Sequence, residues 1–174
     1  MPINNFKTVV DRLVQDLPPD DLLYKSTKGK KSKQYDLFKF INVDKDFTSV
    51  VSKIKEKTIT YLHKNVNEYK VKDLSVASSW TVYGEEGSYH TIHRHDQGGP
   101  QIATVTYLKT PILDDSREEK TEGNFFYFFD NEVYQLKPTE GQIIIMPVWV
   151  LHGTYPQTKG LRQTLSVDFC VDFL

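Results

Sequence analysis

Three histidines crowd into the segment HTIHRHD, where His90, His93 and His95 are followed directly by Asp96. If this segment is extended, His93 and His95 point to the same side, because side-chain direction repeats every two residues in a strand. His90 would then point with Ile92, to the opposite side. Imidazole binds iron, zinc, copper and nickel, so two same-side histidines supply half of a metal site.

His152 comes much later, after the apolar segment QIIIMPVWVL. A close pair of histidines followed by a distant one is the order in which a double-stranded β-helix supplies metal ligands. The sequence therefore predicts a metal centre built from His93, His95 and His152. An H-x-H pair alone is weak evidence, and the alternative is a set of surface histidines without metal.

Arg162 follows ten positions after His152, and Thr164 completes the pattern R-x-T. A guanidinium is planar and permanently charged, so it binds a carboxylate through two parallel hydrogen bonds. The two-residue period puts Arg162 and Thr164 on one strand face. We interpret the pair as a site for a co-substrate with a free carboxylate. The alternative is an arginine paired with a surface glutamate.

The secondary structure that must position these residues changes from helices to strands along the chain. Helical spacing of apolar residues predicts helices over residues 6–17 and 47–62, and the segment YDLFKFINV suggests a strand between them. From about Asp73 the pattern is short strands separated by turns. Helices followed by strands predict an antiparallel β sandwich or barrel with helices on one face. The expected strands cover residues 74–83, 102–108, 123–129, 134–136, 142–146 and 163–172.

Length and composition set further bounds. The chain has 174 residues, which fits a single domain 1–174, with 1–72 as an N-terminal extension and 73–174 as the β core. A net charge of −1 gives no case for nucleic acid or an anionic membrane. The run Lys25 to Lys33, KSTKGKKSK, is the local exception: a solvated loop, or a loop that contacts phosphate. Oligomeric state is open.

Cys170 is the only cysteine, so an internal disulfide is excluded. No signal peptide and no stretch of transmembrane length is seen, and we expect a soluble, cytoplasmic protein without a membrane partner.

The segment from Trp80 to Phe169 resembles a family of small 2-oxoglutarate and Fe(II) oxygenases common in phages and marine bacteria, distantly related to prolyl hydroxylases. The resemblance covers about half of the chain. Its matching pieces are Trp80, Gly87, HRH at 93–95, IATVTYLKTP at 102–111, GNFFYFFD at 123–130, PTEGQIIIMPVWVLH at 138–152 and RQTLSVDF at 162–169.

The resemblance implies a mainly β fold, the double-stranded β-helix of jelly rolls and cupins, with the N-terminal helices packed on one face. It implies Fe(II) as cofactor and 2-oxoglutarate as co-substrate, with ascorbate as an accessory reductant, in a phage-encoded hydroxylase acting on a small-molecule or peptidyl substrate. It assigns the catalytic iron to His93, His95 and His152, and the far carboxylate of 2-oxoglutarate to Arg162, Thr164 and Tyr107.

The sequence leaves three points open. Prolyl hydroxylase relatives use H-x-D, so the second ligand is His95, or Asp96 if the turn is bulged. Tyr83 and Trp149 are candidates for the pocket wall, with core packing as the alternative. The competing functions are a three-histidine cupin dioxygenase, which has no use for a buried Arg162, and a metal-free cupin-like binding protein.

Overall fold

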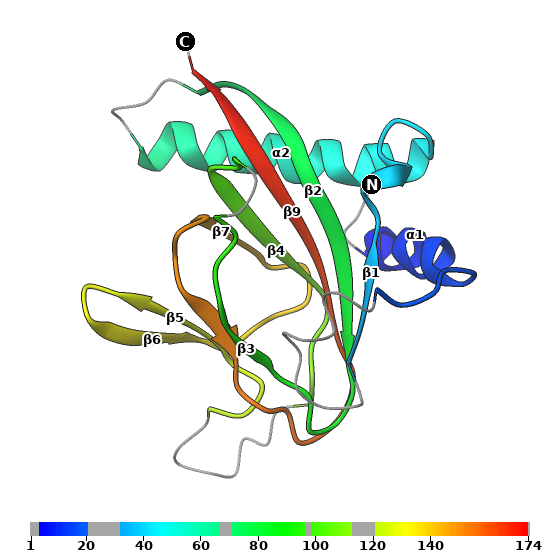
Figure 1. Ribbon diagram of the computed structural model, residues 1–174, viewed down its shortest axis with the longest axis vertical. Coiled ribbons are helices and arrows are strands. Elements are labelled where there is room, and N and C mark those ends of the chain that lie inside the picture. The colour runs from blue at the N-terminus through cyan, green and yellow to red at the C-terminus, as the bar shows by residue number, and fades with distance from the viewer. Residues whose placement is uncertain (1–3, 21–31, 67–70, 97–98, 113–120, 174) are drawn as a thin grey trace.

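The computed structural model describes residues 4–20, 32–66, 71–96, 99–112 and 121–173. Residues 25–31 of the lysine-rich run Lys25 to Lys33 therefore lie outside the described part of the chain. Two antiparallel sheets face each other, and two helices cover the outer face of the larger one (Figure 1). The mainly β double-stranded β-helix with N-terminal helices on one face is confirmed.

The larger sheet has the order β1-β2-β9-β4-β7 and the smaller sheet the order β3-β8-β5-β6. The bounds of the first five are β1 Ser32–Asp36, β2 Val71–Gly84, β9 Arg162–Phe173, β4 Ile102–Lys109 and β7 Ile143–Pro147. Those of the other four are β3 His90–His93, β8 His152–Thr154, β5 Phe125–Phe129 and β6 Glu132–Leu136.

The helices are α1, Asn4–Val14, and α2, Lys45–Asn65. Asp44 caps α2, since its carboxylate accepts a hydrogen bond from the backbone N–H of Phe47 at 2.9 Å. The apolar stripes of both helices pack on the outward face of the large sheet and form one core with it. None of the described helices is long and apolar enough to cross a membrane.

The strand predicted from YDLFKFINV is only partly correct. β1 ends at Asp36, and a short 3-10 helix, η2, covers Phe38–Phe40. The Asp36 carboxylate accepts a hydrogen bond from the backbone N–H of Phe38 at 2.8 Å. This local bond turns the chain where aromatic content alone favours extension.

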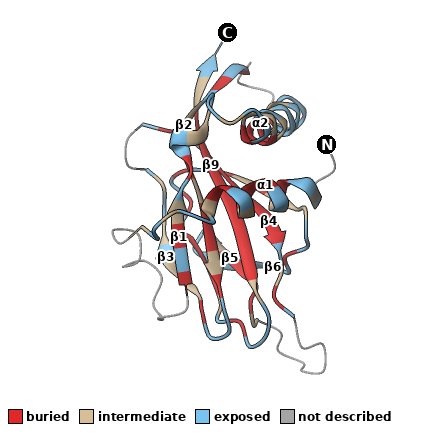
Figure 2. Cartoon of the chain, turned by 90° about the vertical axis from the view of Figure 1, so that its right-hand side faces the viewer, coloured by how far each residue is buried: buried red, intermediate tan, exposed pale blue. Residues whose placement is uncertain are grey.

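β9 is the central strand that positions the site. It is buried on both faces from Arg162 to Phe169, as Figure 2 shows for the strand beneath the helices. Leu165, Val167 and Phe169 point outward into the core under the helices. Their neighbours at the alternate positions, among them Thr164, therefore point inward, between the sheets.

Candidate metal centre and co-substrate pocket

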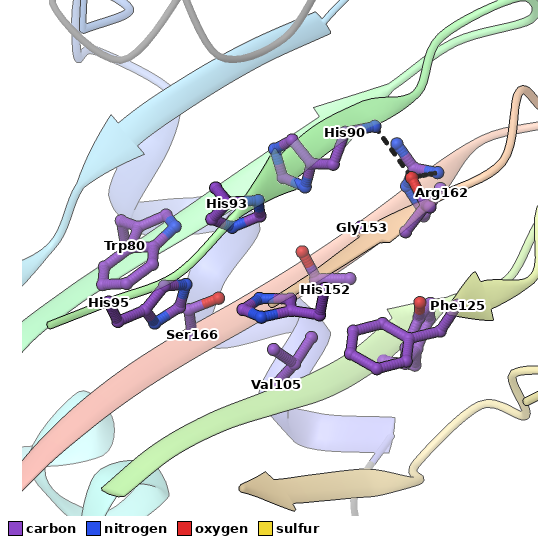
Figure 3. Close-up of a pocket in the computed structure, with 13 residues that line it drawn as sticks. Trp80, His90, His93, His95, Val105, Phe125, His152, Gly153, Arg162 and Ser166 are labelled. Atoms are coloured by element: carbon purple, nitrogen blue, oxygen red, sulfur yellow. Dashed lines mark hydrogen bonds between the residues drawn. The ribbon is translucent and has the colours of Figure 1, made fainter. Parts of the chain in front are cut away.

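The three predicted ligands meet between the two sheets, although His152 comes from far along the chain. His93 ends β3 and His152 begins β8, and the register of these strands puts the two directly opposite each other. His95 follows two residues after His93. One ring nitrogen from each of the three lies within 4.8 Å of the others (Figure 3).

Hydrogen bonds determine which nitrogen faces this centre. The Nδ1 atoms of His93 and His152 lie 2.8 and 2.9 Å from the carbonyl oxygens of Thr91 and Val150. The Nδ1 atom of His95 lies 3.0 Å from the carboxylate of Asp168. Carbonyl and carboxylate oxygens accept hydrogen bonds, so each Nδ1 must carry the proton. Each Nε2 then keeps the lone pair that a metal needs.

The environment favours neutral imidazoles. Burial lowers the pKa of His93, and burial together with the nearby His93 lowers the pKa of His152 to about 3. A metal ligand must be the neutral ring, so these histidines need no deprotonation at neutral pH before binding. The Nε2 atom of His95 is buried and has no hydrogen-bond partner among the described residues.

His90 faces the same pocket, which corrects the expectation for a regular strand. Three steps along β3, from His90 to His93, span two steps along β8, from Thr154 to His152, so β3 carries a bulge. The extra residue reverses the alternation, and both histidines line the pocket. Burial and the charge of Arg162 hold the pKa of His90 well below its usual value.

The other three candidate residues, Asp96, Tyr83 and Trp149, do not line the histidine pocket. Asp96 forms an ion pair with Arg94 at 2.7 Å and is not part of the histidine cluster. Tyr83 is not a wall of this pocket: its hydroxyl donates to Asp11 of α1 at 2.7 Å, on the outer face of the sheet. Trp149 is half-exposed and lines a separate apolar groove beside β7.

The opposite end of the pocket holds a buried cation. Arg162 is 1% exposed, and its Nη1 donates to the Thr154 hydroxyl at 2.6 Å. No acidic side chain among the described residues pairs with it, and its Nη2 has no hydrogen-bond partner there. Tyr107 and Thr164 line the same pocket, and the buried Tyr107 hydroxyl also has no partner in the described part of the chain.

A buried guanidinium without an anion is costly. Burial lowers the pKa of Arg162, and burial raises the pKa of Tyr107 to about 12, so the phenol stays protonated and can donate. Gly84 leaves room for the guanidinium: a Cβ there would lie 3.2 Å from Nη2 of Arg162 and 2.4 Å from the Ser88 hydroxyl. This end of the pocket fits the carboxylate of a small acid.

Several residues of the pocket were not among the predicted site residues. The Trp80 ring lies 5.1 Å from the His95 ring, centroid to centroid, and Phe125 stacks on His152 at 5.4 Å. Thr154 holds Arg162, and Asp168 holds His95. One signal was available for Asp168, because every second position of RQTLSVDF from Arg162 on is polar (Arg162, Thr164, Ser166 and Asp168), although Gln163 between the first two is polar as well.

Fold and site together define a double-stranded β-helix whose pocket has a three-histidine cluster able to hold a metal at one end and the buried Arg162 at the other. The sequence matches the 2OG-Fe(II) oxygenase family over residues 78–169, more than half of the chain. The protein belongs to this family and is an Fe(II)- and 2-oxoglutarate-dependent dioxygenase. Among curated proteins, none matches the sequence.

Solved structures with the same fold are distant in sequence. A prolyl-4-hydroxylase from Pseudomonas putida is 11% identical, with a TM-score of 0.64 over 97% of this chain and 85% of that one. The viral collagen prolyl hydroxylase of Paramecium bursaria Chlorella virus-1 is 15% identical, with a TM-score of 0.64 over 97% and 91%. HygX from Streptomyces hygroscopicus, with nickel and 2-oxoglutarate bound, is 12% identical, with a TM-score of 0.62 over 98% and 79%.

Proposed function

We propose that this dioxygenase holds Fe(II) on the Nε2 atoms of His93, His95 and His152. Two observations support the proposal: one ring nitrogen of each histidine lies within 4.8 Å of the others, and the Nδ1 bonds leave each Nε2 with its lone pair. Three protein ligands would leave coordination positions for the co-substrate and O2, as non-haem iron oxygenases require.

We further propose that Arg162, Thr164 and Tyr107 bind the far carboxylate of 2-oxoglutarate. Arg162 offers Nη2 and Tyr107 its hydroxyl, two buried donors without a partner among the described residues. Thr154 orients the guanidinium from the other side. Arg162 is a buried cation at one end of this pocket, and no described residue supplies its counter-charge. A three-histidine dioxygenase without 2-oxoglutarate does not need this feature.

Iron with 2-oxoglutarate and O2 supplies the oxidising chemistry, in which a substrate C–H becomes C–OH and 2-oxoglutarate becomes succinate and CO2. The residues of this chain bind and orient the iron and its co-substrate. Phe125 stacks on His152 and Trp80 packs beside His95, so both rings are held on their flanks. Val105 adds an apolar wall, which excludes water from a site where it would compete. Ascorbate is a proposed accessory reductant.

For the substrate, a small molecule or a peptide is proposed. One neighbour of this fold was solved with a hypoxia-inducible-factor peptide fragment and another with hygromycin B. An apolar groove of about 440 Å³ adjoins the metal pocket and shares Phe125 with it. Tyr127, Phe129 and Trp149 line this groove, so it suits an apolar part of the substrate. The phage origin and cytoplasmic location stay predictions.

The test is 2-oxoglutarate binding to the anaerobic Fe(II) protein by calorimetric titration. Arg162→Ala removes one partner of a buried charge pair, which costs roughly 2–5 kcal/mol, or about 30-fold to several-thousand-fold in Kd. Arg162→Lys should recover only part of the loss, since an ammonium lacks the fork geometry. Iron binding should stay almost unchanged in both.

Arg12→Ala is the matched control, because Arg12 pairs with Asp44 outside the pocket. It should bind 2-oxoglutarate as the wild type does. Equal affinity in wild type and Arg162→Ala would disprove the carboxylate site. Succinate formation from 2-oxoglutarate by the wild type is the companion assay.

A further inference from the structure

We propose that Asp168 is a positioning residue that supplies, through His95, the negative charge that the metal site lacks among its ligands. The inference rests on the proposed iron site. Two-histidine, one-carboxylate sites bind the carboxylate directly, whereas three neutral imidazoles carry no charge. Asp168 is the one acidic side chain that is buried in the described part of the chain, and it lies one hydrogen bond away from a ligand.

The carboxylate is held from both sides. Its Oδ1 lies 3.0 Å from Nδ1 of His95, and its Oδ2 accepts the Ser78 hydroxyl at 3.2 Å. The side chains of His95 and Asp168 are only 7% and 5% exposed. A carboxylate buried this deeply is unfavourable unless it is compensated, and a nearby divalent cation provides that compensation.

His95 differs from the other two proposed ligands in where the hydrogen-bond partner of its Nδ1 lies along the chain. His93 and His152 each bond to a carbonyl two residues earlier, so local backbone geometry orients them. His95 lies beyond the end of β3, and its partner comes 73 residues later, from β9. Asp168 therefore fixes the proton on Nδ1 and aims Nε2 at the centre, a role that carboxylates play behind histidine ligands in other metal sites.

Asp168→Asn and Asp168→Ala separate charge from orientation. The asparagine oxygen can still accept from Nδ1, so this variant keeps the orientation and loses the charge. The alanine variant loses both. Outer partners of metal-bound histidines typically contribute 10- to 100-fold to metal affinity. We expect Fe(II) to bind about 10-fold more weakly to Asp168→Asn, and about 10- to 100-fold more weakly to Asp168→Ala, by anaerobic calorimetry.

A second readout uses the metal-free protein. Two-bond ¹H–¹⁵N correlation spectra of the histidine rings distinguish the Nδ1–H from the Nε2–H form. We expect His95 to be the Nδ1–H form in wild type and in Asp168→Asn, and to lose this preference in Asp168→Ala. A merely structural role would lower stability without changing the ring tautomer.

Asp172→Asn is the matched control, since Asp172 lies on the same strand and pairs with exposed Lys72 at 3.3 Å. It should leave metal affinity and the His95 tautomer unchanged. Wild-type metal affinity in Asp168→Asn, with the Nδ1–H form also retained in Asp168→Ala, would overturn the proposal. If Asp168→Ala does not fold, affinity in Asp168→Asn alone decides. A wild-type protein that binds no Fe(II) would instead refute the proposed iron site, while the tautomer test of Asp168 would still stand.

Discussion

At the scale of the residue, His95 rather than Asp96 is the proposed second ligand, because it joins the histidine cluster. His95 is turned into the cluster and Asp96 is held by Arg94 outside it. We predict that His93→Ala, His95→Ala and His152→Ala each lose stoichiometric iron, whereas Asp96→Ala retains it. Metal analysis after anaerobic loading and desalting measures this. Loss of iron in Asp96→Ala with retention in His95→Ala would show that the ordinary carboxylate triad forms instead.

The buried histidines also predict how the metal-free protein responds to acid. The pKa of His152 is about 3 in the folded protein, against an ordinary value of 6.5, so unfolding takes up a proton between these values. The stability from the neutral ring is present above about pH 6.5 and is lost as the pH falls below it. Between about pH 6.5 and 5, His152 should account for a loss of about 1–2 kcal/mol.

Urea unfolding of the metal-free protein at these two pH values measures the loss. His152→Gln should lose correspondingly less of its own free energy of unfolding over the same interval. An equal loss in wild type and variant would show that His152 does not remain neutral in the folded protein.

At the scale of the element, β8 carries the distal histidine through very close contacts. A Cβ on Gly153 would lie 2.7 Å from Cζ of Phe126 and 2.8 Å from the carbonyl oxygen of His90. The first contact can be relieved by a side-chain movement, but the second is with the backbone of β3. Gly153→Ala should therefore destabilise the protein by about 1–3 kcal/mol.

The double variant Gly153→Ala/Phe126→Leu distinguishes the two contacts. It should remain destabilised relative to Phe126→Leu alone, because the His90 carbonyl is still in the way. Denaturant unfolding provides the comparison. An unfolding free energy of the double variant equal to that of Phe126→Leu would show that the β3 backbone moves aside at little cost.

At the scale of the whole molecule, the N-terminal helices share one hydrophobic core with the outer face of the large sheet. Phe6 of α1 is 1% exposed and belongs to the same cluster as Leu165 of β9. Both tryptophans, Trp80 and Trp149, lie in the β part, so their fluorescence reports on that part. If residues 1–174 form a single domain, Phe6→Ala should lower the unfolding free energy followed by tryptophan fluorescence by about 3–5 kcal/mol.

Phe38→Ala is the control, because the Phe38 side chain is 46% exposed and its removal should change stability by less than about 0.5 kcal/mol. Circular dichroism and fluorescence transitions should coincide in all variants. If Phe6→Ala leaves the unfolding free energy from fluorescence unchanged, the extension 1–72 unfolds independently of the β core.

The sequence by itself determined the class of the fold and the residues at the two ends of the pocket. Short β-rich segments separated by turns predicted most strands, and the order of His93, His95, His152 and Arg162 indicated the two ends of the pocket. These signals are local, because alternation along a strand decides which side chains share a face.

Only the tertiary structure decided the rest. The bulge that turns His90 inward arises from the pairing of β3 with β8, which no local pattern of β3 reveals. The aspartate behind His95 comes from a strand 73 residues away, and Tyr83 faces a helix rather than the pocket. Register and sheet order fix such contacts, and a shift of one residue moves every side chain to the other face.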